Sequence, residues 1–179
     1  MQVKILSSEY ISQHSYFTAR KEAYQLPSGK IVDPYFVLEI PPSATAMAIT
    51  EDNQVVLVEQ YRHPIGEKIL ELPGGFIEEG EDPSIAIGRE LMEETGYEFS
   101  EIIYLGTTNA NPGVMNNPTF LYLAKGGKKV SAQDLDPNEE IDIVLKSLDE
   151  VKSLLAESKI KQSMHALCLF YGFAHIEKS

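Results

Sequence analysis

The chain lacks several features that define whole classes of protein. It has one cysteine, Cys168, and no tryptophan among 179 residues. A single cysteine excludes an internal disulfide and suits a reducing compartment. No apolar run approaches the length of a membrane span, and the first eight residues hold no stretch long enough for a signal peptide. We therefore expect a soluble, cytoplasmic protein.

Positive charge is also scarce. Lys and Arg number 15 against 27 Asp and Glu, which gives a formal net charge of -12. This balance argues against nonspecific binding to nucleic acid or to an anionic membrane, since both need basic patches. A polyanionic substrate would be repelled unless a metal ion accompanied it. The length suits one core, or a core with a small appendage.

The segment 75–97 places four carboxylates at fixed spacing around one short helix. Asp82 can cap a helix that opens at a proline and stops before Gly96, so we predict a helix over Pro83–Thr95. Its 3.6-residue period predicts an apolar face made of Ser84, Ile85, Ile87, Gly88, Leu91, Met92 and Thr95. The opposite face gathers Glu90, Glu93 and Glu94.

These three glutamates repel one another on an isolated helix, so something must offset their charge. Arg89 lies four residues before Glu93 and can pair with it, which leaves Glu90 and Glu94 to offer oxygen atoms to a hard divalent ion. Magnesium fits this all-oxygen chemistry, and it characteristically binds through one or two carboxylates and the phosphates of a substrate. The alternative is an amphipathic helix with a solvated acidic face.

The fixed offsets in this segment resemble the Nudix hydrolases. Their pattern is G-x5-E-x7-R-E-U-x-E-E-x-G-U, with U aliphatic, and Tyr97 departs from it at the last position. The chain matches every other specified position: Gly75, Glu81, Arg89, Glu90, Leu91, Glu93, Glu94 and Gly96.

Outside this box, the chain resembles the ADP-ribose and nucleoside diphosphate sugar pyrophosphatases within that family. The resemblance rests on the segments 60–64 (QYRHP) and 71–77 (ELPGGFI), on Pro112, and on an alternating N-terminal segment with a turn at 27–30. It implies an α/β/α sandwich with a mixed sheet over residues 41–179. A small antiparallel β-sheet over residues 1–40, with a role in dimerisation and base binding, precedes it.

The order of elements agrees with that fold class, although the pattern alone leaves α/β and α+β open. Beyond the box helix, we expect strands at 44–49, 54–61, 69–72, 102–107, 119–124 and 141–145, a polar loop at 126–138, and helices at 148–157 and 161–173.

The resemblance also implies roles for the box residues. Glu90 and Glu94 would bind Mg²⁺, which Mn²⁺ can replace, together with the Gly74 carbonyl. Glu93 would bind the metal ion or orient the other ligands. Glu81 would lie behind these ligands, and Arg89 would hold the acid cluster in place. Its planar guanidinium has several N–H donors in a fixed arrangement, which lysine lacks.

A general base is implied in an acidic loop downstream, where Glu139 and Glu140 are the candidates. Neighbours in an extended segment point opposite ways, so only one of the two can face the site. The alternative is that both are ordinary loop acids without a catalytic role.

For the substrate, Arg62 can contact two phosphate oxygens at once, although it could equally be a surface arginine. Pro112 belongs to the resemblance, and the alternative is that Pro112 with Gly113 simply forms a turn. The aromatic residues of the N-terminal sheet could supply a face for a nucleobase, although such residues more often pack a sheet. They are Tyr16, Phe17, Tyr24, Tyr35 and Phe36, with Tyr35 or Phe36 preferred.

We therefore predict a Mg²⁺-dependent enzyme that splits a nucleoside diphosphate sugar, such as ADP-ribose or an NDP-hexose, into nucleoside monophosphate and sugar phosphate. The alternatives are a hydrolase for dinucleoside polyphosphates, NADH or RNA 5′ ends, and a noncatalytic ligand sensor. Residues 1–40 are too few to bury both faces of a sheet, so this sheet needs packing on something else. The resemblance implies pairing through such a sheet, so we expect a symmetric homodimer. The alternative is that the sheet folds back on its own Nudix domain.

Overall fold

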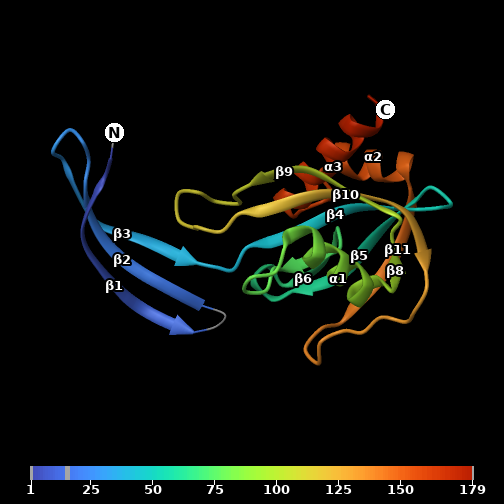
Figure 1. Cartoon of the computed structure of the whole chain (residues 1–179), viewed down its shortest axis with the longest axis horizontal. Helices are drawn as coiled ribbons and strands as arrows, with labels where there is room; N and C mark the ends of the chain where they lie inside the picture. Colours follow the sequence, from blue (N-terminus) through green and yellow to red (C-terminus); the bar gives the residue numbers. More distant parts are fainter. Residues whose placement is uncertain (1, 15–16, 179) are drawn as a thin grey trace. The chain divides into compact units, whose positions relative to one another are not determined.

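The computed structural model of the chain describes residues 2–14 and 17–178. Contacts between residues divide the chain into two units. The first contains Met1–Pro41 and Asn109–Pro118, and the second contains Pro42–Thr108 and Thr119–Ser179 (Figure 1). The predicted division of the chain at residue 40, and the role given to the first domain, stay predictions.

The first unit is a three-stranded antiparallel sheet, as predicted. Its strands are β1 (Lys4–His14), β2 (Phe17–Gln25) and β3 (Ile31–Glu39), in the order β1-β2-β3. Residues 109–118 join this unit through β3, because the Leu38 N–H donates to the Val114 carbonyl at 2.7 Å and Leu38 bridges Met115.

The second unit holds an eight-stranded mixed sheet. Its strands are β4 (Ser43–Thr50), β5 (Gln54–Arg62), β6 (Glu67–Glu71), β7 (Gly74–Phe76), β8 (Tyr97–Glu98), β9 (Glu101–Thr108), β10 (Thr119–Lys129) and β11 (Ile141–Ser147). The central order is β11-β5-β4-β10-β8, with β6 paired to β5, β7 to β4 and β9 to β10. The pair β4 and β10 is parallel, and the other pairs of this sheet are antiparallel.

Helices cover both faces of this sheet, which confirms the predicted α/β/α sandwich. The helix α1 (Pro83–Thr95) packs on one face, and α3 (Ser163–Ile176) packs on the other, with α2 (Leu148–Ala156) beside it (Figure 1). Alternate residues of β4 serve the two layers. Ala44, Ala46 and Ala48 join the core under α1, while Met47 and Ile49 join the core under α2 and α3. Small side chains on the α1 face let that helix lie close to the sheet.

Three short elements were not expected from the sequence: β7, β8 and the 3₁₀ turn η1 (His63–Ile65). They are too short to carry a periodic signal. The predicted loop at 126–138 was also wrong at its start, because β10 runs on to Lys129. A register break between Ala124 and Gly127 lets it do so, with Gly126 at φ 68°.

The predicted apolar face of α1 is correct at Ile87, Leu91 and Thr95, which are buried, but wrong at Ile85, which is 64% exposed.

Within the described ranges, no helix is long and apolar enough to cross a membrane.

Candidate active site

Helix α1 begins and ends where the sequence predicts. The Asp82 carboxylate accepts a hydrogen bond from the Ser84 N–H at 2.8 Å, and Pro83 occupies the first turn. Gly96 ends the helix in the left-handed conformation, with its N–H donating to the Met92 carbonyl at 2.7 Å. These local signals fix the register of the glutamates on the helix.

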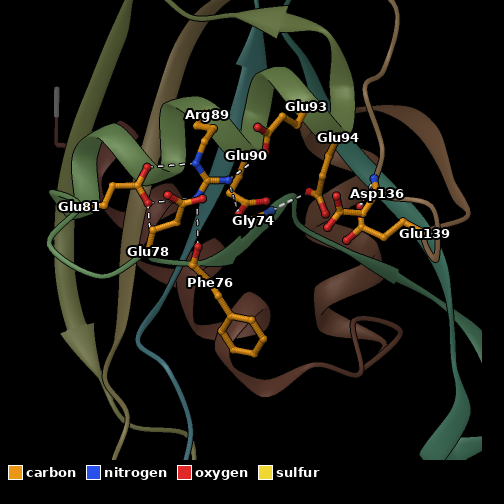
Figure 2. Close-up of polar contacts among 10 residues, drawn as sticks. All are labelled: Gly74, Phe76, Glu78, Glu81, Arg89, Glu90, Glu93, Glu94, Asp136 and Glu139. Carbon is orange, nitrogen blue, oxygen red and sulfur yellow. Dashed lines mark hydrogen bonds and ion pairs between the residues drawn. The ribbon is translucent and has the colours of Figure 1, made fainter. Parts of the chain in front are cut away.

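Arg89 is the centre of the acid cluster (Figure 2). Its guanidinium donates to both oxygens of Glu81 at 3.0 and 3.1 Å, to Glu90 at 2.9 Å and to Glu93 at 2.9 Å. A further N–H reaches the Phe76 carbonyl at 3.1 Å. The predicted pairing with Glu93 is confirmed. The expectation that Glu90 stays free of Arg89 was wrong, because the Arg89 guanidinium also donates to the carboxylate of the next residue, Glu90.

Glu90 and Glu94 are the two most enclosed acids of the helix. Burial raises the pKa of the Glu90 carboxyl, and the Arg89 guanidinium opposes that rise. Burial raises the pKa of Glu94 to about 8, with the Gly74 N–H opposing it and the charges of Glu90 and Glu139 adding to it. Water solvates the charged form of a buried carboxylate poorly, and nearby like charges increase the cost. A cation at this place would relieve both penalties.

Two glycines allow β7 to approach these acids. The Gly74 N–H donates to the Glu94 carboxylate at 2.8 Å. Gly74 has φ 146°, and a Cβ there would lie 2.2 Å from the Ala44 carbonyl oxygen. A Cβ on Gly75 would lie 2.6 Å from the carboxylate of Glu90. The backbone of β4 restricts the first position to glycine, and a side chain at Gly75 would push the Glu90 carboxylate out of its present place.

The donor set suits a hard cation that also takes ligands from a substrate. Among residues 2–14 and 17–178, no three or more His, Cys, Asp or Glu side chains form a ready-made metal site. Glu81 and Glu93 point their oxygens at Arg89, and Glu90 also gives one oxygen to it. The enclosed pair Glu90 and Glu94 remains, and one or two carboxylates are what Mg²⁺ takes from a protein when phosphates complete its shell.

The acidic loop after β10 brings one of the two candidate bases to the cluster. Glu139 is half-buried, and its charge acts on both Glu90 and Glu94. Its carboxylate accepts from the Asp136 N–H at 3.2 Å, and Figure 2 shows it beside Glu94. Glu140 is exposed and acts instead on Lys68, whose pKa is raised mainly by its hydrogen bond to Asp142. The structure thus places Glu139, and not Glu140, next to the acid cluster, a choice that the sequence alone left open.

Arg62 lies near the cluster and is held by a buried acid. Its Nε atom donates to one oxygen of Glu71 at 2.8 Å, and its Nη2 atom forms an ion pair with the same oxygen at 2.8 Å. The Glu71 side chain is 2% exposed, whereas that of Arg62 is 45% exposed. Burial raises the pKa of Glu71 and Arg62 opposes the rise, while the Arg62 charge also lowers the pKa of Glu94. Sequence reasoning assigned no role to Glu71, because a lone acid in a strand pattern gives no signal of burial.

His165 supports the same segment from the opposite face of the sheet. Its Nδ1 atom accepts the Leu72 N–H at 3.1 Å, two residues before Gly74. Burial lowers the pKa of His165 to about 3, and the Arg62 charge adds to this effect. The imidazole is therefore neutral and serves as an acceptor. Only the fold, which brings α3 under this segment, identifies this contact.

The predicted base-binding residues lie in the first unit. The Tyr35 hydroxyl donates to the Gly113 carbonyl, next to Pro112, and the Tyr35 ring meets Tyr24 edge to face at 5.5 Å. Phe36 is 51% exposed. Tyr16 lies outside the described residues. The structure thus joins Tyr35 to the loop that carries Pro112, within one unit.

A helix that displays an arginine-held acid cluster on a mixed sheet suits chemistry on phosphate compounds with a divalent ion. The NUDIX domain model matches residues 40–167, more than half of the chain, so this protein belongs to the Nudix family. A second model, the nucleoside diphosphate sugar hydrolase N-terminal domain, matches residues 3–38. The predicted family and branch are confirmed. The chain is a hydrolase of phosphoric anhydrides, and Nudix hydrolases generally use divalent metals.

Two relatives match this protein over almost its whole length. The chain is 34% identical over 169 residues to the methanol dehydrogenase activator of Bacillus methanolicus, covering 94% of this chain and 91% of that protein. It is 24% identical over 172 residues to the ADP-ribose pyrophosphatase of Bacillus subtilis (strain 168), covering 96% and 92%. A solved structure described as an ADP compounds hydrolase aligns with a TM-score of 0.86 at 19% identity, over 99% of this chain and 96% of that one. That likeness confirms the fold.

The neutral state of His165 predicts a pH-dependent stability. Its pKa is about 3 when folded against 6.5 for the free side chain, so between these values the unfolded chain binds the proton and the folded chain does not. Stability is therefore lost as the pH falls below 6.5. From pH 8 to pH 5, we expect the wild type to lose about 2 kcal/mol more than His165→Asn, which keeps an acceptor but does not titrate.

Urea unfolding at both pH values measures this difference. His165→Asn itself should cost about 1–3 kcal/mol at pH 8, because it shortens a buried side chain. Equal pH dependence in the two proteins would show that folding does not lower the pKa of His165.

Proposed function

We propose that this protein hydrolyses the pyrophosphate bond of a nucleoside diphosphate sugar, ADP-ribose or an NDP-hexose, to nucleoside monophosphate and sugar phosphate. The observation that carries the proposal is the arginine-held acid cluster, whose enclosed pair Glu90 and Glu94 fits a cation that binds with phosphate. The substrate class is supported by the N-terminal domain model and by the name of the Bacillus subtilis relative.

Glu90 and Glu94 would hold Mg²⁺, or Mn²⁺ in its place, with the Gly74 carbonyl. Glu93 and Glu81 would orient these ligands through Arg89. When bound, the metal neutralises charge on the pyrophosphate oxygens and makes water more acidic. The protein's own contribution is position, because Arg89 and β7 fix the carboxylates before any ligand arrives.

Glu139 would act as the general base. It takes a proton from the attacking water, whose oxygen bonds to phosphorus while the bond from phosphorus to the bridging oxygen breaks. The products leave as two phosphate monoesters. Arg62 would bind phosphate oxygens through the N–H groups that Glu71 does not use, since Glu71 holds one side of the fork. Tyr35 or Phe36, with the loop at Pro112, would contact the nucleobase.

A substrate panel tests the function. The protein is incubated in Mg²⁺ with ADP-ribose, ADP-glucose, GDP-mannose, NADH, a dinucleoside polyphosphate and capped RNA, and the products are identified by chromatography. We expect nucleoside monophosphate and sugar phosphate from at least one nucleotide sugar, at a higher kcat/KM than from the other compounds. Hydrolysis of none of them would favour a noncatalytic sensor and contradict the proposal.

A second candidate is hydrolysis of a nicotinamide dinucleotide. The 34% identity to a protein named methanol dehydrogenase activator favours it, because many dehydrogenases use a nicotinamide dinucleotide, which has its own pyrophosphate bond. The same panel separates the two candidates. A kcat/KM for NADH above that of every nucleotide sugar would select the second.

The assignment of the base predicts different effects at adjacent positions. Glu139→Gln should lower kcat by about 10²-fold or more with little change in KM, because a general base contributes on that scale. Glu140→Gln removes the same charge from the same loop and should leave kcat within about twofold of the wild type. Equal rates for the two variants would contradict the assignment, and steady-state kinetics measures both.

We also propose a cytoplasmic homodimer formed through the first unit. Its outer strand β1 is exposed along almost its whole length, and apolar residues there face solvent: Ile5, Leu6, Tyr10 and Ile11. Exposed apolar area of this kind favours association. Light scattering should give twice the chain mass of 20.0 kDa. Tyr10→Glu with Ile11→Glu should shift it toward the monomer, while a fully active wild-type monomer would contradict the dimer.

A further inference from the structure

The segment between β10 and the acidic loop is bonded to the C-terminal end of α1. The last carbonyls of a helix have no partner within it. Here donors from residues 129–134 reach the carbonyls of the last three helix residues and that of Gly96. They are the Asp134 N–H to Glu93 at 2.9 Å, the Gln133 amide to Glu94 at 2.7 Å, the Lys129 ammonium to Thr95 at 2.5 Å, and the Val130 N–H to Gly96 at 2.9 Å.

Gln133 differs from the other donors because its side chain reaches two elements. The same Nε2 atom donates to the Glu94 carbonyl at 2.7 Å and to the Ile141 carbonyl at 3.0 Å. Ile141 is buried and opens β11, at the far end of the acidic loop. Gln133 therefore joins both ends of the loop to the residue of α1 that carries the enclosed carboxylate.

Apart from the Asp134 N–H, which bonds the start of the loop to Glu93 of α1, the described hydrogen bonds of residues 134–140 stay inside the loop and none reaches β11. The Glu139 N–H donates to the Asp136 carbonyl at 2.9 Å, and the Asp136 N–H donates back to the Glu139 carboxylate at 3.2 Å. These bonds shape the turn but stay inside it. The place of Glu139 relative to Glu94 thus depends on how the two ends of the loop are held.

We propose that Gln133 is a positioning residue, which sets Glu139 against the acid cluster by closing the loop onto α1. The inference rests on the proposed role of Glu139 as base. A displacement of about 1 Å in a reacting group can cost on the order of 10² in rate, so one polar side chain can control the step without touching substrate.

Lys129 supplies the matched control. Its ammonium also donates to the end of α1, at Thr95, but it lies 5.3 Å from the Tyr97 ring centre rather than against β11. Lys129→Met and Gln133→Met each remove one side-chain bond from the helix end. Only Gln133→Met also opens the loop. Gln133→Glu keeps the length of the side chain without its N–H donors and serves as a second variant.

The first readout is amide hydrogen exchange over residues 134–140, in protein without metal. Both Gln133 variants should exchange at least about tenfold faster there than the wild type, while Lys129→Met should not. The second readout is kinetic: the Gln133 variants should lose about tenfold or more in kcat with KM nearly unchanged. Unchanged exchange, or an equal kinetic effect of Lys129→Met, would overturn the proposal.

A double variant separates positioning from general damage. If Gln133 acts through Glu139, then Gln133→Met should cost nothing further in a protein that already carries Glu139→Gln. A full additional loss in that background would overturn the proposal. Full activity of Glu139→Gln alone would remove Glu139 as base and with it this role of Gln133, whereas the exchange result would still show whether Gln133 closes the loop.

Discussion

The site depends on one side chain with more donors than any of its neighbours. Arg89 presents five N–H groups in a rigid plane, and the structure uses them on Glu81, Glu90, Glu93 and the Phe76 carbonyl. It thereby joins α1, the turn before it and β7 into one frame. Its own pKa is raised, chiefly by Glu81, so the charge that holds the frame persists at any working pH. A lysine could neutralise the same acids but could not fix their directions.

Beside this frame the protein buries two carboxylates, each with a hydrogen-bond donor. Glu71 is almost fully enclosed with Arg62 as its partner, and Glu94 is enclosed with a backbone N–H from Gly74. Burying a carboxylate without compensation is costly, so the direction of the pKa shifts shows where a positive charge is missing. The demand is greatest at Glu94, where Glu90 and Glu139 add like charge. That is the physical reason to place the cation there.

The parts of the fold that could be predicted from sequence are those set by local signals. Asp82, Pro83 and Gly96 define α1 within a residue, since a cap, a first-turn proline and a left-handed glycine act over one turn. Alternating β-branched residues located most strands. β7 and β8 carry too few residues for a period, and the GG pair in β10 suggested a loop where a bulge lets the strand continue.

The residues of the acid cluster and the contact of Arg89 with Glu93 could be predicted from sequence, whereas the other contacts could not. Side chains at adjacent helix positions do not face each other on an ideal helix, so the bond from Arg89 to Glu90 had no sequence signal. Nor could alternation say which of Glu139 and Glu140 faces inward, because the fold alone decides the orientation of the loop. Contacts from His165 and Gln133 join segments far apart in the chain, and only the packed structure shows them.

The most direct test of the account is the effect of Glu94→Gln on turnover of the best substrate in saturating Mg²⁺, followed by ³¹P NMR. The variant keeps the shape of the side chain and the folded core but removes the charge that we assign to the metal. We expect the wild type to convert the pyrophosphate signal into two monoester signals. The variant, with an unfolding transition no lower than that of the wild type, should be slower by at least about 10²-fold. Turnover at the wild-type rate would show that Glu94 holds no catalytic metal and would contradict the account.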